Sequence, residues 1–316
     1  MLLGVTKAVP GVLLSGAMVR LAQLTGTAKI NLSAWTWPMS ITLPLFITGL
    51  LYLLGCIRRA QHAAACAKLS PLPALAFASG WFSLLFALNS PLHEISEQLF
   101  WVHMTQHEIL VLVAAPLLVL SRPFSAFLWG LPASWRQPFA SLATHRPVKR
   151  IWSLLVSPMV AWTLHAAALW FWHAPVLFNQ TLTSDAVHGL QHVSFLGTAL
   201  LFWWALVYGH GGKSNYGASI LYVFTTAVHT SVLGALLTFA SRPWYAPYAS
   251  STMAWGLTPL QDQQIGGLIM WVPAGTVLIA IGLWMVPKWL KSADRRWDLS
   301  PSAEFIRANS GVAREN

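Results

Sequence analysis

The stretch that decides the fold is "LFWVHMTQHEILVLVAAPLLVL", Leu99–Leu120. An α-helix needs about 20 predominantly apolar residues to cross the hydrocarbon core of a bilayer, and this run is long enough. It lacks the alternation of apolar and polar residues that a membrane-spanning barrel strand shows. Near its start it nevertheless carries two histidines, a methionine, a glutamine and a glutamate, although polar groups in hydrocarbon are costly. The stretch therefore predicts a membrane-spanning helix whose polar residues serve a function.

The rest of the chain has the same character. Of its 316 residues, 56% are hydrophobic and only 9% are charged, whereas a soluble domain carries about a quarter charged residues. The apolar runs that can each cross a bilayer are residues 40–57, 72–90, 99–120, 153–172, 187–208, 217–240 and 265–286. The sequence therefore predicts an all-α polytopic membrane protein, with a bundle of seven transmembrane helices between residues 35 and 290. Residues 1–34 are expected to form an interfacial or signal-like segment, and residues 291–316 a polar cytoplasmic tail.

The positive charges predict the orientation of the bundle. Most Lys and Arg residues follow the first, third, fifth and seventh runs, and cytoplasmic loops are enriched in these residues. The loops on the other side carry the acids Glu94, Glu97, Asp185 and Asp262. We therefore expect the N-terminus outside and the C-terminus in the cytoplasm. Because the net charge of +10 is spread over short loops, it indicates topology and contacts with membrane lipid rather than a nucleic-acid partner.

A basic, proline-rich loop, residues 121–152, joins the third and fourth runs. We expect a short interfacial helix in it, around residues 132–142, facing anionic lipid or the acidic surface of a partner.

Two pairs of histidines define the candidate site. His103 and His107 are four residues apart, as are His188 and His192, and this spacing stacks both side chains on one face of a helix. Both helices are expected to enter the membrane from outside, which places His103 and His107 about 6 and 12 Å below the outer surface. Two such faces can together supply the ligands of one or two metal ions. The sequence therefore predicts a metal site in the outer part of the membrane.

Lesser candidates surround these four histidines. His165, His173 and His229 lie on other predicted helices, and Met104 stands beside His103. Imidazole and thioether ligands together favour copper, with Cu(I) as the expected state, and Met253 and Met270 are further thioethers expected near this depth. The two cysteines, Cys56 and Cys66, match no zinc spacing.

Two acids are expected to support the site rather than to bind the metal. Glu108 can orient a ligand or relay protons, or it can be a structural carboxylate within the bundle. Asp262 precedes the last helix and can hydrogen-bond a histidine ring or, more simply, cap the amino end of its own helix.

Other interpretations fit single features of this pattern. Any one of these histidines can be a residue that merely hydrogen-bonds between helices. Haem b, held by two axial histidines in an electron-transfer protein, is the competing cofactor, but two histidines one turn apart cannot be its opposite ligands. A copper transporter is the third alternative, and it needs ligands continuing towards the inner half, where only His229 extends the path.

Four motifs in order along the chain resemble a known family. They are "HMTQHEILVLVAAPLLVLSRP" (103–123), "WFWHAPVLFN" (170–179), "AVHGLQHVSFLGTALLFWW" (186–204) and "PWYAPYASSTMAWGLTPLQDQQIGGLIMWVP" (243–273). They are similar to those of the CtaG family of caa-type cytochrome c oxidase assembly factors, seven-span proteins of the bacterial inner membrane. The resemblance extends over about residues 35–289.

The resemblance implies a non-enzymatic role in the assembly of a haem-copper oxidase, with oxidase subunits or other assembly factors as partners. It implies that copper is handled on the periplasmic side of the membrane. The residues that stand in matching motifs are His103, Met104, His107, His173, His188, His192, His229 and Asp262.

Overall fold

The computed structural model describes residues 35–63, 71–209 and 216–298, with side chains up to residue 293. The predicted N-terminal segment, 1–34, and residues 299–316 of the predicted tail lie outside the described residues. Within the described residues the chain is helical and contains no strand, which confirms the all-α prediction.

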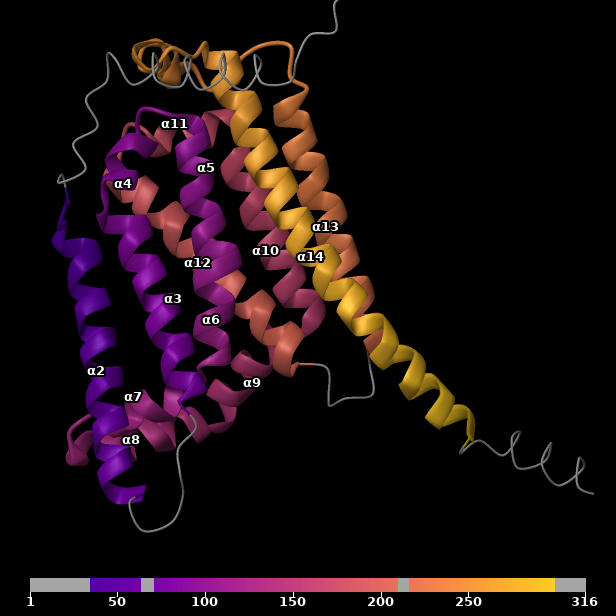
Figure 1. Ribbon diagram of the computed structural model, residues 1–316. Helices are drawn as coiled ribbons and strands as arrows, with labels where there is room; N and C mark the ends of the chain where they lie inside the picture. Colours follow the sequence, from indigo (N-terminus) through magenta and orange to yellow (C-terminus); the bar gives the residue numbers. More distant parts are fainter. Residues whose placement is uncertain (1–34, 64–70, 210–215, 299–316) are drawn as a thin grey trace, which may run out of the picture.

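The helices that are long and apolar enough to cross a membrane form an elongated bundle (Figure 1). They are α2 (Met39–Ala63), α3 (Leu72–Asn89), the continuous stretch Phe100–Leu120, α12 (Asp185–Tyr208), α13 (Tyr216–Thr238) and α14 (Pro259–Asp298). These six spans agree with six of the seven predicted runs, and they make the chain a membrane protein. α14 extends well beyond the predicted run 265–286 at both ends.

The predicted fourth span is broken. α9 (Arg146–Leu155) and α10 (Pro158–His173) meet at a bend of 62°, and they make a seventh span only if the bent pair is counted as one. The break falls before Pro158, because proline has no N–H to donate and disfavours helical backbone in the preceding residue. α10 alone is about 24 Å long, slightly shorter than the hydrocarbon core. The count of seven stays a prediction.

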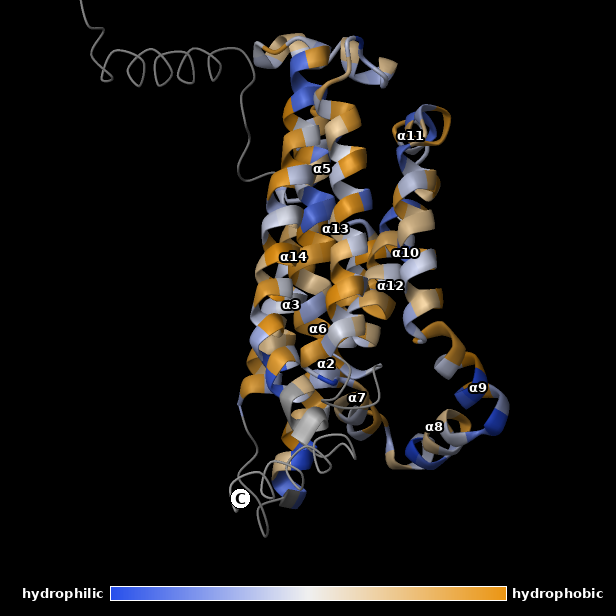
Figure 2. Cartoon of the chain, turned by 90° about the vertical axis from the view of Figure 1, so that its right-hand side faces the viewer, coloured by the Kyte–Doolittle hydropathy of each residue, from blue (hydrophilic) through white to orange (hydrophobic). Residues whose placement is uncertain are grey.

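Short helices close both ends of the bundle (Figure 1). α4 (Pro91–Ser96) and α11 (Pro175–Thr181) lie at one end, and α7 (Phe124–Gly130) and α8 (Ala133–Thr144) lie at the other. α8 confirms the helix predicted around residues 132–142, while its place at a lipid interface stays a prediction. Figure 2 shows hydrophilic residues concentrated on α8 and α9, away from the largely apolar long helices. The orientation of the bundle relative to the two sides of the membrane also stays a prediction.

The third span is not a uniform α-helix. Between α5 (Phe100–Glu108) and α6 (Ala115–Leu120) the backbone forms a π-helical segment, η1 (Ile109–Ala114). Pro116, just beyond it, removes one backbone donor. The Val111 carbonyl accepts a hydrogen bond of 2.8 Å from Trp203 Nε1 of α12. This side chain therefore satisfies a backbone group that would be costly to leave unpaired in lipid.

Glycines allow α2 and α7 to cross in contact. A Cβ atom at Gly55 would collide with the carbonyl oxygen of Ala126, and one at Gly130 would collide with the carbonyl oxygen of Leu51. The two helices therefore pack backbone against backbone, the arrangement that small residues permit in membranes.

This crossing predicts a large difference between two identical substitutions. Gly55→Ala is expected to lower the free energy of unfolding by about 1–3 kcal/mol, because the methyl group overpacks a rigid backbone contact. Gly197→Ala in α12 is the matched control, since a Cβ there meets nothing within 4 Å. Thermal unfolding in mild detergent measures both. Equal unfolding temperatures for the two variants would contradict this packing.

Candidate metal centre

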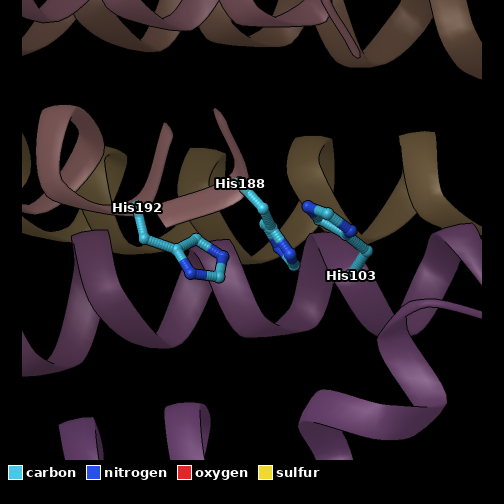
Figure 3. A group of neighbouring side chains, drawn as sticks. All are labelled: His103, His188 and His192. Carbon is cyan, nitrogen blue, oxygen red and sulfur yellow. The ribbon is translucent and has the colours of Figure 1, made fainter. Parts of the chain in front are cut away.

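Three histidines from two helices converge at the end of the bundle near α4 and α11. His103 comes from α5, and His188 and His192 come from α12. Each offers one nitrogen, and these nitrogens lie within 4.8 Å of one another. Figure 3 shows the three rings side by side between the two helices. The group, called here the inner triad, has the spacing that a small ion needs to draw three ligands together.

His107 adds a fourth imidazole to the inner triad. Its Nε2 lies 3.0 Å from Nε2 of His103, and its ring centre is 5.3 Å from that of His192. The two histidine pairs predicted from the sequence therefore face each other across α5 and α12. Their role as metal ligands stays a prediction.

The inner triad is buried, and two of its nitrogens lack hydrogen bonds. His103 has no exposed surface, and His188 and His192 are each only 5% exposed. Nε2 of His188 and Nε2 of His192 have no hydrogen-bond partner among the described residues. Because a buried polar atom without a partner costs free energy, these two nitrogens are stabilised by binding an ion or a water molecule.

Tyr248 and Gln191 contact the two nitrogens of the His103 ring. The Tyr248 hydroxyl donates to the Ser96 carbonyl at 2.9 Å and lies 3.2 Å from Nδ1 of His103. Burial raises the pKa of Tyr248, so the hydroxyl keeps its proton. Its oxygen can accept a hydrogen bond from Nδ1–H, whereas Gln191 Oε1, 3.3 Å from Nε2, can accept one from Nε2–H. In the first of these two tautomers Nε2 of His103 carries the lone pair that metal ligation requires.

His173 has its proton fixed by a backbone carbonyl. Its Nδ1 lies 2.6 Å from the Leu169 carbonyl, which can only accept, so Nδ1 carries the proton. Its Nε2 is buried without a partner among the described residues, and its ring centre is 6.4 Å from that of His107. His173 is therefore placed next to the inner triad but outside it.

A buried cavity extends from this region into the bundle. Its volume is about 40 Å³, enough for a few water molecules. Its polar wall includes His107, Glu108, His165 and His173. Glu108 lines this space, and its Oε2 has no hydrogen-bond partner among the described residues. No hydrogen bond from Glu108 to a described histidine ring is seen, so the structure gives no sign that it orients a ligand.

The deeper histidines do not join the inner triad. Nδ1 of His165 lies 3.2 Å from Thr198 Oγ1, and the His229 ring packs edge-on against Trp162 with ring centres 5.4 Å apart. Both ring nitrogens of His229 lack partners among the described residues.

The three thioethers lie in different surroundings. Met104 is fully buried in an aromatic cluster around Phe100, on the side of α5 that faces α14, because it follows His103 directly and so points about 100° away around the helix. Met270 lines the cavity together with His107 and His173, and Met253 is largely exposed. A mixed imidazole and thioether site stays a prediction.

Asp262 caps a different helix from the expected one. Its carboxylate accepts hydrogen bonds from the backbone N–H groups of Phe100 at 2.7 Å and Trp101 at 3.0 Å. The first N–H groups of a helix have no partner within it, and α5 has no capping side chain of its own. Asp262 of α14 therefore fixes the start of the helix that carries His103 and His107. It makes no hydrogen bond to a described histidine ring.

Sequence reasoning missed several residues around the inner triad. The His93 ring stacks on that of His188 at 5.4 Å, and Gln191 Oε1 lies 3.3 Å from Nε2 of His103. His93, Glu97 and His188 also form a second group whose ligand atoms lie within 4.8 Å of one another. Burial lowers the pKa of His93, against the opposing effects of nearby acids, first of all Glu97. The local signal was "PLHEISE", a histidine between acids beside a predicted span, but nothing in it gives the contact with His188.

Comparison with known proteins gives the family. The family model described as "Cytochrome c oxidase caa3 assembly factor (Caa3_CtaG)" matches residues 50–292. Uncharacterized proteins of Mycobacterium bovis and Mycobacterium tuberculosis are each 26% identical to this chain over 254 residues. The match covers 76% of this chain but only 38% of each relative, so the chain spans well under half the length of these curated proteins. No solved structure matches the chain. The family match includes all four motifs noted in the sequence, and the chain belongs to the caa3-type cytochrome c oxidase assembly factors.

Proposed function

We propose that this membrane protein assists the assembly of cytochrome c oxidase by binding a copper ion as cargo and passing it to the maturing enzyme. The observation that carries the proposal is the inner triad, in which nitrogens of His103, His188 and His192 lie within 4.8 Å of one another. The family supports the assembly role, and the histidine geometry supports the copper.

The chemistry of the ligands favours copper, and Cu(I) in particular. Imidazole binds copper well, and Cu(I) is stable with two, three or four ligands. Three buried imidazoles can surround it after small shifts, while the apolar surroundings exclude water and disfavour the more highly charged Cu(II). Tyr248 supports this role when its oxygen accepts a hydrogen bond from Nδ1–H of His103, since Nε2 then carries a lone pair that can bind the ion.

Nearby histidines supply a means of releasing the ion. His107 Nε2 is 3.0 Å from His103 Nε2, and His173 offers a further unpartnered nitrogen. An ion can move between such sets by exchanging one imidazole for another, with no change in oxidation state. The role is that of a metal chaperone rather than of an enzyme with a turnover reaction.

The haem alternative fits this arrangement less well. The rings of His103 and His188 are stacked, with their centres 4.9 Å apart. They therefore contact each other and leave no space for a flat haem between them. The absorbance spectrum of the purified protein decides the matter, because a Soret band at stoichiometric haem would overturn the copper proposal.

Copper transport across the membrane is the second candidate function, and the buried cavity favours it. The cavity continues from His107 and His173 to His165 and Glu108, towards the middle of the bundle. Transport predicts that deleting the gene changes cytosolic copper, whereas a chaperone at the outer face predicts no change.

Removal of the α5 pair tests the proposed function. His103→Ala combined with His107→Ala is expected to lower the copper content of the purified protein by at least about tenfold, because two adjacent imidazoles are lost. Oxidase activity in cells is expected to fall with it. Elemental analysis in mild detergent and oxygen uptake by membranes measure the two effects.

His145→Ala is the control for this experiment. His145 is exposed and follows α8 at the opposite end of the bundle, so its loss is expected to leave both measurements unchanged. Unchanged copper content and oxidase activity in the double variant would show that the inner triad is not the copper site.

The place of action is part of the proposal. The acids Glu94, Glu97 and Asp185 lie at the histidine end of the bundle, whereas Arg58 and Arg136 lie at the end with α7 and α8. Since basic residues collect on the cytoplasmic side, this distribution supports a site on the periplasmic side of the inner membrane. Partners there are expected to be oxidase subunits or other assembly factors.

A further inference from the structure

A second candidate metal group shares a ligand with the inner triad. It consists of His93, Glu97 and His188, whose ligand atoms lie within 4.8 Å of one another. His188 belongs to both groups. Because two cations held on one imidazole ring would lie close together and repel each other, we treat the two groups as alternative positions for one ion.

The second group leads from the surface to the interior. Glu97 is exposed at the end of α4, His93 is half-buried on that helix, and His188 is 95% buried. Nε2 of His188 has no hydrogen-bond partner among the described residues. His93 stacks on His188 and also lies 6.4 Å from His192, measured between ring centres. The inner triad, by contrast, is buried throughout.

The two groups differ in the chemistry of their ligands. A carboxylate is a harder ligand than imidazole, so the group that contains Glu97 holds Cu(I) less firmly than three imidazoles do. The negative charges of Glu94 and Asp185 act on His93 together with that of Glu97, which favours the arrival of a cation. Attraction is therefore strongest at the surface, and binding is strongest inside.

We propose that His93, Glu97 and His188 form an outer copper site, which receives the ion and passes it to the inner triad through the shared His188. This inference rests on the proposed function, since it assumes that copper is the cargo. During transfer the bonds from copper to Glu97 and His93 break as bonds to His103 and His192 form. His188 is a ligand before and after the transfer, the oxidation state is unchanged, and no electron donor is needed.

The rate of loading tests the outer site. Glu97→Gln is expected to slow the uptake of Cu(I), supplied anaerobically from a bicinchoninate complex, by about tenfold, since it removes both a ligand and an attracting charge. The equilibrium affinity of the inner triad is expected to change by less than about fivefold, because Glu97 is exposed and outside it. Stopped-flow absorbance gives the rate, and titration gives the affinity.

Glu94→Gln is the matched control. Glu94 is an exposed acid on the same short helix, and it does not belong to either group. Loading by this variant is expected to slow by no more than about twofold, because it loses one attracting charge but no ligand. A Glu97→Gln variant that loads at the wild-type rate, or a Glu94→Gln variant slowed as much, would overturn the outer site.

An equilibrium measurement isolates the outer site. His103→Ala combined with His192→Ala removes two members of the inner triad, and weak Cu(I) binding is expected to remain. Addition of Glu97→Gln is expected to weaken that remaining binding by at least about tenfold, because the outer site then keeps only His93 and His188. If Glu97→Gln left this weak binding unchanged, the outer site would be overturned and the inner triad would not. A wild-type protein that binds no copper would overturn the proposed function itself.

Discussion

His188→Ala is expected to abolish copper binding and oxidase assembly together. This side chain is shared by the inner triad and the outer site, so one substitution takes a ligand from both. Loss of residues that merely support a ligand costs about 10–100-fold in affinity, so loss of the ligand itself is expected to cost more than about 100-fold. Elemental analysis of the purified variant and oxygen uptake by membranes measure the effect. No other histidine in the described residues joins both groups.

The control for His188→Ala lies on the same helix. Leu190 of α12 is largely exposed, so Leu190→Ala leaves both groups intact and is expected to retain copper and oxidase activity. The unfolding temperature of His188→Ala without copper is expected to fall by only a few degrees, because the variant loses the ring contacts with His93 and His103 but no hydrogen bond at Nε2. Retention of copper at the wild-type level by His188→Ala would contradict both sites.

Asp262→Asn is expected to loosen the helix that carries His103 and His107. The carboxylate is fully buried and accepts two backbone hydrogen bonds at the start of α5. The amide keeps one acceptor and turns its NH2 group towards the second backbone N–H. Since a hydrogen bond to a charged group contributes about 1.5–3 kcal/mol, and an unpaired buried N–H adds a penalty, we expect a loss of about 3 kcal/mol in stability. Thermal unfolding in detergent and copper titration measure the effects on fold and site.

Asp185→Asn separates this effect from a general loss of negative charge. Asp185 also lies in the first turn of a long helix, but it is exposed. Its replacement is expected to change stability by less than about 0.5 kcal/mol. If the two variants unfolded at the same temperature, the hydrogen bonds from Phe100 and Trp101 to Asp262 would have no structural importance.

The sequence was sufficient for the parts of the fold that depend on hydrophobicity alone. Six apolar runs became helices of membrane-spanning length, because hydrocarbon leaves the backbone few ways to satisfy its polar groups. The bend of 62° before Pro158 and the π-helical segment η1 were not predicted. The bend lies before a proline, but hydropathy does not show whether a proline in an apolar run breaks the helix. The π-helical segment depends on a backbone group finding a partner in a neighbouring helix, Trp203 for Val111, and hydropathy carries no information on this.

The candidate site was also predictable only in part. The pairs His103 with His107 and His188 with His192 follow from helical spacing, because each pair lies within one helix. The contacts of His93, Tyr248 and Asp262 with these helices were missed, because they are contacts between elements far apart in the sequence.

The π-helical segment rotates the two halves of the third span, α5 and α6, relative to each other. Each residue turns an α-helix by about 100°, so the additional residue that a wider turn accommodates shifts the rotational phase of α5 relative to α6. α5 can thereby direct His103 at His188 of α12, while Ala115 and Val119 of α6 pack in one apolar cluster with Phe202 of the same helix. Deleting a single residue between Ile109 and Ala114 would restore a regular helix and rotate the histidines away from their partners, with the membrane-spanning length almost unchanged. The direction in which the candidate ligands His103 and His107 point thus depends on the number of residues in η1 as well as on residue type.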